Sequence, residues 1–253
     1  MGLDFKINEE RCTVCGACAA DCPTKVIKMD GLPQMVNEEG CMRCQHCLAV
    51  CPTAALSILG TDPDDMTQLE GNYPEAEKLE TLIKGRRSYR LYKQENIEPE
   101  LMDELLEVAM HAPTGVNALG LQFSVIDDKM VMDRFVEKVY TAIENRDDLP
   151  ENMKMFEKFA ELYRNKGIDV LFRGAPHLIV VTADAKSVCP AEDCVIALSY
   201  FELYAQSKGL GTVWDGFGRW ILDAFPELKK DLNIPDDNKM GYARNTTRYP
   251  NNQ

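Results

Sequence analysis

The chain has 253 residues, 45% of them hydrophobic, and carries 41 acidic against 28 basic side chains, a net charge of −13. This balance argues against nucleic acid or an anionic membrane as a partner, since both repel an acidic protein. No apolar run in the sequence reaches the length that spans a bilayer. We therefore expect a protein that uses neither nucleic acid nor a membrane.

Eight of the ten cysteines fall in two copies of one spacing, C-x2-C-x2-C-x3-C-P. Thiolates are the ligands that iron–sulfur clusters take, and this run is typical of chains that hold [4Fe-4S] cubes. In two-cluster proteins the last cysteine of each run binds the other cube. The spacing therefore predicts two cubes, one held by Cys12, Cys15, Cys18 and Cys51, and the other by Cys41, Cys44, Cys47 and Cys22.

Two other uses of these cysteines are disfavoured. A zinc ribbon takes its ligands as two spaced pairs, which leaves the third cysteine of each run and the Cys-Pro step without a role. A disulfide framework needs an oxidising compartment, and residues 1–6 do not form a signal peptide. About the first sixty residues resemble the bacterial two-cluster ferredoxin, with every ligand position filled. We expect a reducing, cytoplasmic location in an anaerobe.

The charge pattern divides the chain after the cysteine runs. We expect a two-cluster ferredoxin domain at residues 1–60, an acidic linker at 61–76 that becomes helical after Pro74, and a larger domain at 77–253. The linker is either a docking surface or, as is more common for such runs, a solvated connector.

A basic segment, residues 84–93, follows the acidic linker and has five basic residues in ten positions. Guanidinium groups bind phosphate oxygens through two parallel hydrogen bonds, and a hydroxyl adds a neutral donor. The run Arg86-Arg87-Ser88-Tyr89-Arg90 therefore suits a phosphomonoester. A solvated basic turn that pairs with the acidic linker is an equally good interpretation of the spacing alone.

Hydrophobic periodicity predicts alternating helices and strands beyond the basic segment. The helix at 128–145 should bury a stripe of Val131, Phe135 and Val139. The very apolar helix at 191–208 should be buried and end at Gly209 as its C-terminal cap. The other predicted elements are helices at 99–110 and 152–167 and strands at 121–126 and 175–182.

Two further stretches carry a resemblance to the nitroreductase family of FMN flavoproteins. The basic segment, a helix and Ala112-Pro113-Thr114-Gly115-Val116-Asn117 follow each other as at the start of that family, and residues 209–217, GLGTVWDGF, resemble its second signature. The resemblance implies an α+β fold with a central mixed sheet flanked by helices, an FMN cofactor, and a homodimer with the flavin sites at its interface.

The resemblance also assigns residues to the flavin. Arg86, Arg87, Ser88 and Arg90 would hold the FMN tail, while Pro113, Thr114 and Asn117 would line the cofactor. The backbone amides of Asp215 and Gly216 would face the N5/O4 edge of the ring, where a backbone donor tunes the flavin without presenting an acid. Arg248 is the first candidate for a phosphate contact near the C-terminus, with Arg244 second.

The sequence departs from the family at two places. Leu119 and Gly120 stand where many members have Gln-Pro, and the segment after Ala243 looks like a shortened form of the family's C-terminal arm. Asn117 also fits an Asx turn, and the glycines at 209–216 also fit a tight helix-to-strand connection.

Neither the three histidines nor the last two cysteines show a catalytic pattern. We expect His46, His111 and His177 to be ordinary satisfied side chains and Cys189 and Cys194 to be core thiols. No side chain stands out as a catalytic acid, base or nucleophile, which suits chemistry carried by a cofactor.

These features together predict a fusion of a ferredoxin domain with an FMN nitroreductase-like domain. The expected activity is electron transfer from a redox donor, such as reduced ferredoxin or NAD(P)H, through [4Fe-4S] clusters and FMN to a nitroaromatic, quinone or similar conjugated small-molecule acceptor. The alternatives are a non-catalytic redox carrier or sensor, and a different reductive flavin chemistry such as dehalogenation.

Overall fold

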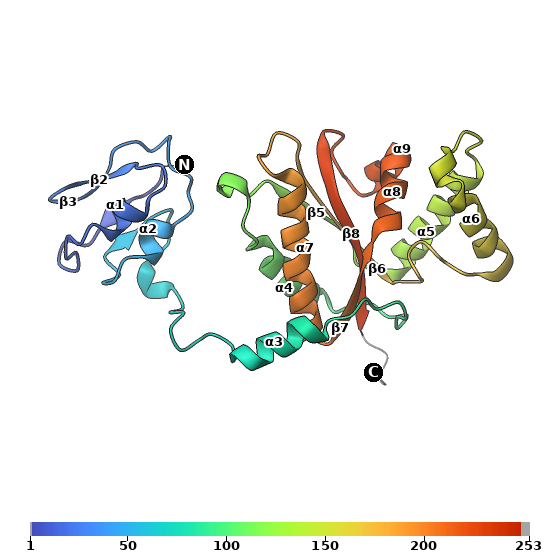
Figure 1. Cartoon of the computed structure of the whole chain (residues 1–253), viewed down its shortest axis with the longest axis horizontal. Coiled ribbons are helices and arrows are strands. Elements are labelled where there is room, and N and C mark those ends of the chain that lie inside the picture. The colour runs from blue at the N-terminus through green and yellow to red at the C-terminus, as the bar shows by residue number, and fades with distance from the viewer. Residues whose placement is uncertain (1, 249–253) are drawn as a thin grey trace. The chain divides into compact units, whose positions relative to one another are not determined.

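The computed structural model describes residues 2–248, with side chains at 240 and 242–248 left out. The chain divides into two compact units, Met1–Pro74 and Glu75–Gln253, hereafter the N-terminal and C-terminal units (Figure 1). No helix of the described residues is long and apolar enough to cross a membrane.

Short elements build the N-terminal unit around its cysteine turns. Strand β1 pairs antiparallel with β4, and β2 with β3. Leu3, Leu56 and Ile58 are each 1% exposed and form a small core together with several of the cysteines. The elements are β1 (Lys6–Ile7), α1 (Ala17–Asp21), β2 (Ile27–Asp30), β3 (Leu32–Met35), α2 (His46–Ala49), β4 (Leu56–Ser57) and the 3-10 helix η1 (Pro63–Asp65).

The two halves of this unit repeat one backbone path. Helices α1 and α2 both begin after a residue in the left-handed region, Gly16 with φ 75° and Gln45 with φ 58°. Val14 and Arg43, at matching positions of the two cysteine runs, share φ values of 54° and 55°. Left-handed backbone is disfavoured for residues with a Cβ, so its recurrence shows that both turns are held in the same geometry.

The C-terminal unit is an α+β domain with a four-stranded sheet in the order β5-β6-β8-β7. All three strand pairs are antiparallel, and a parallel bridge joins Ser88 to Thr212 at the β7 edge. The elements are α3 (Ala76–Gly85), α4 (Pro99–Met110), η2 (Gly115–Asn117), β5 (Leu121–Ile126), α5 (Lys129–Glu144), η3 (Glu151–Met153), α6 (Met155–Lys166), β6 (His177–Asp184), α7 (Pro190–Ser207), β7 (Leu210–Asp215), α8 (Gly216–Ala224), α9 (Pro226–Asp231) and β8 (Asn238–Arg248).

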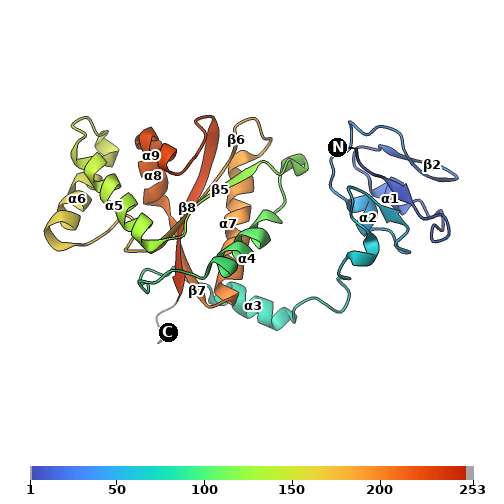
Figure 2. The same ribbon diagram turned by 180° about the vertical axis from the view of Figure 1, so that it is seen from behind.

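Helices cover both faces of this sheet (Figures 1 and 2). Strand β6 shows why, because its side chains alternate between two cores: Leu178 and Val180 pack with α5, α8 and α9, and Ile179 packs with α4 and α7. Each fully buried aliphatic side chain contributes about 1.5–3 kcal/mol through removal of apolar surface from water. A strand hydrophobic on both sides needs a helical layer on both sides.

Gly241 sets the approach of α7 to β8. A Cβ on this residue would lie 2.1 Å from the Cβ of Cys194 and 3.2 Å from the carbonyl oxygen of Val181. Helix α7 therefore lies against the sheet at a distance that only glycine permits. Cys194 is fully buried at this contact.

Most predicted elements match the structure. The helix at 99–110 and the strand at 121–126 have the expected bounds, and Gly209 follows α7 with φ 76°. The predicted stripe of α5 is wrong at its first member, since Val131 is 42% exposed while Met132 is buried. Asp128 caps this helix by accepting a hydrogen bond from the Val131 N–H at 2.9 Å, which places Val131 in the solvated first turn.

Candidate functional site

The eight N-terminal cysteines line two separate cavities. The two cavities are of nearly equal size, as expected if they hold groups of the same size. One is lined by Cys12, Cys15, Cys18 and Cys51, and the other by Cys22, Cys41, Cys44 and Cys47. The structure thus brings together the two sets that the spacing predicts, including the exchange of the last cysteine between the two runs.

Each cavity has the donor set of an iron–sulfur cube. Among the described residues, no three Cys, His, Asp or Glu side chains converge tightly enough to hold a single metal ion. The four thiols of each set instead lie around the wall of their cavity, as cysteine ligands lie around a [4Fe-4S] cluster. The residues present therefore fit the predicted cubes.

Hydrogen bonds reach the sulfur atoms of the two exchanged cysteines. The Thr24 hydroxyl lies 3.6 Å from Cys22 Sγ, and the Thr53 hydroxyl lies 3.9 Å from Cys51 Sγ. The Ala55 N–H also donates to Cys51 Sγ at 3.2 Å. Burial acts to raise the pKa of both thiols, but the threonine and backbone hydrogen bonds together outweigh it and lower the pKa of Cys22 and of Cys51.

Cys18 and Cys47 have a different environment. Burial is the largest influence on both thiols, and it raises the pKa of Cys18 and raises that of Cys47 to about 11. Backbone hydrogen bonds and neighbouring cysteines act more weakly on each. A buried thiol becomes a ligand only as the thiolate, so metal binding at these positions must drive release of the proton.

A cavity of about 360 Å³ lies in the C-terminal unit, where β7 ends and α8 begins. Its wall includes three of the residues predicted from the sequence, Arg90, Asp215 and Gly216. Its volume is within the range of small-molecule and cofactor sites. We call it the β7–α8 cavity.

Asp215 is placed in this wall by its role as a helix cap. The residue is 4% exposed, and its carboxylate accepts a hydrogen bond from the Gly218 N–H at 2.8 Å. A carboxylate at this position accepts a hydrogen bond from an N–H group of the first turn of α8 that has no partner within the helix. Its charge also complements the positive end of the helix dipole. The side chain therefore has a structural use, as expected for a residue whose backbone amide is the predicted flavin contact.

The basic segment runs along the β7 edge of the sheet. The Tyr89 N–H donates to the Thr212 carbonyl at 3.0 Å, next to the bridge between Ser88 and Thr212. Arg87 donates to the carbonyls of Lys84 and Arg86, both at 2.9 Å. Arg90 lines the β7–α8 cavity and donates to the Ser88 carbonyl at 3.3 Å.

The loop with the other predicted flavin residues lies at the opposite edge of the sheet. Pro113, Thr114 and Asn117 precede β5, which is the far edge strand from β7. The Gly115 N–H donates to Asp193 Oδ1 of α7 at 3.0 Å, and Thr114 accepts from the Leu119 N–H at 3.0 Å. One chain therefore does not bring this loop to the β7–α8 cavity.

The remaining predictions concern Arg248, His177 and the late cysteines. Arg248 pairs with Leu210 through the strands, and its side chain falls outside the described part of the structure. His177 is fully buried and accepts a hydrogen bond from the Ile97 N–H at 3.2 Å, a satisfied state as expected. Burial raises the pKa of Cys194 to about 12, which keeps this core thiol neutral.

Sequence reasoning missed two of the four charged residues in the wall of the β7–α8 cavity, Arg173 and Arg219. The aromatic side chains of Trp214, Phe217 and Trp220 also line it. Arg219 follows Gly216 by three residues on α8, so helical spacing from the second signature could have found it. Arg173 lies in the loop before β6, far from every motif, and no sequence signal marks it.

Paired four-thiol cavities in one unit and a cofactor-sized cavity in an α+β unit define an iron–sulfur oxidoreductase. Residues 83–243 match the model of the nitroreductase family, and the chain belongs to that family. Residues 4–52 match a 4Fe-4S dicluster domain. These matches confirm the fusion, the α+β fold class, the two [4Fe-4S] clusters and FMN as cofactors, and the class of FMN-dependent oxidoreductase.

Two proteins and one solved structure show the similarity of this chain to known proteins. A putative NADH dehydrogenase/NAD(P)H nitroreductase of Methanothermobacter thermautotrophicus is 29% identical over 172 residues, which cover 66% of this chain and 75% of the relative. An iodotyrosine deiodinase of Thermotoga neapolitana is 24% identical over 189 residues, covering 69% and 94%. A solved nitroreductase with bound FMN from Bacteroides fragilis has a TM-score of 0.59 at 21% identity, covering 70% of this chain and 90% of that one, which shows a shared fold.

Proposed function

We propose that this protein reduces a conjugated small-molecule acceptor, such as a nitroaromatic or a quinone, with electrons drawn from reduced ferredoxin or NAD(P)H. The observation that carries the proposal is the presence, in one chain, of two four-thiol cavities and of the β7–α8 cavity with its nitroreductase-family signature. Clusters supply single-electron transfer and FMN supplies two-electron reduction, so the fusion suits the conversion of one into the other.

The chain's own residues divide the binding task. We assign the phosphate end of FMN to Arg86, Arg87 and Ser88 on the β7 edge, because guanidinium and hydroxyl donors match phosphate oxygens. Arg90 and the amides of Asp215 and Gly216 would border the flavin within the β7–α8 cavity. No catalytic acid or base is assigned, since Asp215, a buried carboxylate of this wall, is used as a helix cap.

A homodimer would complete the flavin site. The Pro113–Asn117 loop and the β7–α8 cavity lie at opposite edges of one sheet, so a second copy is needed if both contact the same flavin. Sedimentation velocity of the anaerobic holoprotein should show a dimer. A monomer with full flavin occupancy would contradict this arrangement.

Anaerobic stopped-flow absorbance tests the activity. The holoprotein is first reduced by light with a deazaflavin, then mixed with 4-nitrobenzamide or a benzoquinone, and flavin reoxidation is followed. We expect reoxidation that repeats through many turnovers when reduced ferredoxin or NAD(P)H is supplied. Flavin that stays reduced with every nitro compound and quinone would remove the reductase proposal, and oxidation by a partner protein alone would favour a redox carrier.

Reductive dehalogenation is a second candidate, supported by the similarity to the Thermotoga neapolitana deiodinase. This candidate predicts halide release from an iodinated phenol by the same photoreduced protein. Ion chromatography of the quenched mixture measures the halide. Flavin reoxidation by nitro compounds without halide release from any halophenol would favour the first function.

A further inference from the structure

Three arginines line the β7–α8 cavity of a chain whose net charge is −13. They are Arg90, Arg173 and Arg219. No ion pair joins Arg173 to any residue in the described part of the chain, and Arg219 Nε lies 3.9 Å from a carboxylate oxygen of the exposed Asp223. The wall also contains one carboxylate, that of Asp215, which accepts a hydrogen bond from the Gly218 N–H, against the three guanidinium groups. The cavity is therefore a local concentration of positive charge.

Arg173 is held toward the cavity by a backbone conformation that arginine disfavours. Its φ is 59°, in the left-handed region, where a Cβ is costly. Asp169 fixes the residues on both sides, because its carboxylate accepts the Phe172 N–H at 3.0 Å and the Gly174 N–H at 2.8 Å. The loop thus maintains an unfavourable conformation whose effect is to keep Arg173 in the cavity wall.

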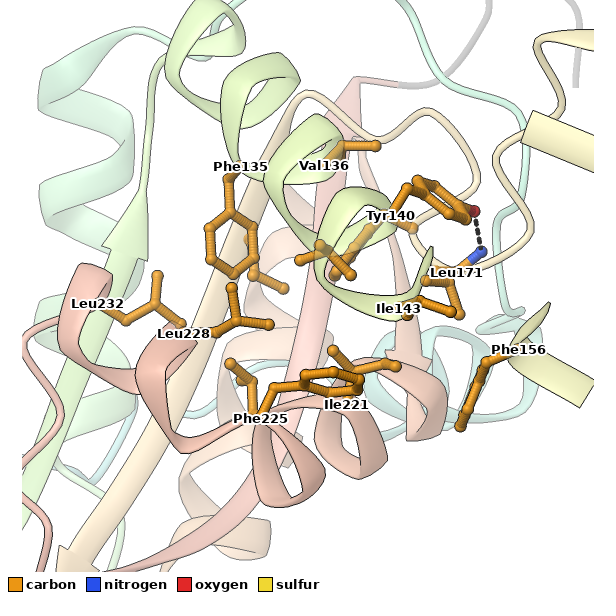
Figure 3. Packing of buried hydrophobic residues seen from close by; sticks show 14 of the residues in the cluster. Phe135, Val136, Tyr140, Ile143, Phe156, Leu171, Ile221, Phe225, Leu228 and Leu232 are labelled. Atoms are coloured by element: carbon orange, nitrogen blue, oxygen red, sulfur yellow. Dashed lines mark hydrogen bonds between the residues drawn. The ribbon is translucent and has the colours of Figure 1, made fainter. Parts of the chain in front are cut away.

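Tyr140 of α5 anchors this loop from the core. Its hydroxyl donates to Asp169 Oδ1 at 2.8 Å and accepts from the N–H groups of Val170 and Leu171 at 3.1 and 3.3 Å. Tyr140 itself is 0% exposed, and Figure 3 shows its contact with Leu171 inside the packed core. A core hydroxyl therefore determines the position of a surface arginine.

The rest of the wall is aromatic. Phe217 and Trp220 meet edge to face with centroids 6.4 Å apart, and Trp214 lies at the end of β7. Flat conjugated rings pack favourably against such side chains. Trp220 is nevertheless 47% exposed, so the aromatic wall is open to an incoming molecule.

The residues proposed for the phosphate end of FMN are not part of the wall of the β7–α8 cavity. Ser88 bridges Thr212 near the middle of β7, Asp215 and Gly216 follow at the strand end, and Arg219 and Trp220 come later on α8. Arg86 and Arg87 are not in the cavity wall. Arg173 and Arg219 are therefore arginines in addition to those proposed to bind the phosphate.

We propose that Arg173 and Arg219 bind a carboxylate on the acceptor, so that the protein selects conjugated aromatic acids over neutral rings of the same shape. This inference rests on the proposed function, since it names the substrate class of that site. For a nitrobenzoate, two electrons from the reduced holoprotein and two protons from water give the nitroso compound and water. The carboxylate stays unchanged and serves only recognition.

Equilibrium binding tests the inference without turnover. Benzoate and benzamide have the same ring and nearly the same shape but differ in charge, and binding of each to oxidised FMN-loaded protein is read from the flavin absorbance change. We expect benzoate to bind more tightly than benzamide. Arg173→Gln and Arg219→Gln should each weaken the binding of benzoate by about tenfold or more, because each removes a charged hydrogen bond to the carboxylate. The affinity for benzamide should stay within about twofold of the wild-type value.

One control variant and two contrary results complete this binding test. Lys158→Gln removes an exposed charge of α6 and should change neither ligand. Loss of FMN on desalting of Arg173→Gln or Arg219→Gln would show that these side chains hold the cofactor phosphate, and would overturn the inference. Equal affinity of the wild type for benzoate and benzamide would also overturn it.

Single turnover separates this inference from the proposed function. Photoreduced protein should be reoxidised faster by 4-nitrobenzoate than by 4-nitrobenzamide, and Arg173→Gln should erase the difference. Reoxidation at equal rates by both compounds would keep the reductase and refute the carboxylate site. Arginine-dependent benzoate binding without any reoxidation would keep the site and refute the reductase.

Tyr140→Phe tests the positioning role. Loss of the hydroxyl leaves Asp169 without its anchor, so benzoate affinity should fall while benzamide affinity and flavin content stay the same. Arg173→Gln does not disturb the core and keeps the inference testable if Tyr140→Phe fails to fold. Unchanged benzoate binding by folded Tyr140→Phe would show that the Asp169 loop holds Arg173 without the tyrosine.

Discussion

Arg86 Nη1 lies 3.1 Å from Glu202 Oε1, in an ion pair that links the end of α3 to the C-terminal half of α7. The Glu202 side chain is 8% exposed, while that of Arg86 is 40% exposed. Trp214 Nε1 donates to the other carboxylate oxygen at 3.3 Å. The first arginine of the basic segment is thus held by a buried acid beside the β7 edge.

Removal of Arg86 should therefore destabilise the C-terminal unit. Arg86→Met removes a charged partner of the buried Glu202 carboxylate, and we expect a loss of about 1–2 kcal/mol in the free energy of unfolding, because the loss of one partner of a buried ion pair is costly and the arginine is partly solvated. Both tryptophans of the chain lie in this unit, so tryptophan fluorescence during denaturation measures the change.

The double variant Arg86→Met/Glu202→Gln is the decisive comparison. It removes both charges and should recover most of the lost stability, although FMN retention should remain weak if Arg86 holds the phosphate. Lys84→Met, which removes an exposed partner of Glu80, serves as the control. A double variant less stable than Arg86→Met would contradict the ion-pair explanation.

The exchange of the last cysteines predicts selective cluster loss. Cys51→Ser should remove the cube that shares a cavity with Cys12 and leave the other, so that iron falls from about eight to about four atoms per chain. Cys22→Ser should do the same to the other cube, and the two variants should keep different electron paramagnetic resonance signals. Cys189→Ser, outside both cavities, should leave the iron content unchanged.

The threonine hydroxyls near the exchanged cysteines should tune the reduction potentials. A hydrogen bond to sulfur stabilises the more negative reduced cluster, so Thr24→Val and Thr53→Val should each lower one potential. A net hydrogen bond of about 1 kcal/mol corresponds to roughly 40 mV for one electron. Spectroelectrochemical titration measures the shift, which should be larger for Thr24, whose hydroxyl is 3.6 rather than 3.9 Å from sulfur.

Serine variants control for the loss of a methyl group. Thr24→Ser and Thr53→Ser keep the hydroxyl and should retain potentials near that of the wild type. If the valine and serine variants change the reduction potential by the same amount, packing rather than hydrogen bonding sets that potential.

The acid stability of the C-terminal unit should depend on Arg164. Hydrogen bonds from this guanidinium to Glu144 hold the pKa of that carboxyl below its ordinary value of 4.5. A carboxyl with a lowered folded pKa contributes stability that is fully present above pH 4.5 and is lost as the pH falls through the folded value.

Arg164→Gln should therefore reduce stability at neutral pH and flatten its decline in acid. Tryptophan fluorescence during denaturation at pH 7 and at successive values below 4.5 measures both effects. Lys158→Gln, which removes a charge without an ion pair among the described residues, should keep the wild-type slope. Parallel acid slopes for Arg164→Gln and the wild type would exclude the pair as the cause.

Local patterns predicted much of the fold and part of the candidate site. The helix at 99–110 and the strand at 121–126 were predictable because their side-chain periodicity directly reflects which face is buried. The error at Val131 arose where a capping aspartate, and not the apolar stripe, set the start of α5.

The sequence by itself determined the two cluster ligand sets, since the spacing of soft thiolates within each run leaves little freedom in how they surround a cube. The two nitroreductase signatures could also be recognised from the sequence alone. Only the tertiary structure decided that Arg173 and Arg219 join Arg90 in one cavity and that the 113–117 loop lies at the opposite sheet edge. These relations depend on strand order and on a loop anchored by Tyr140 and Asp169, contacts between distant residues that no local spacing encodes.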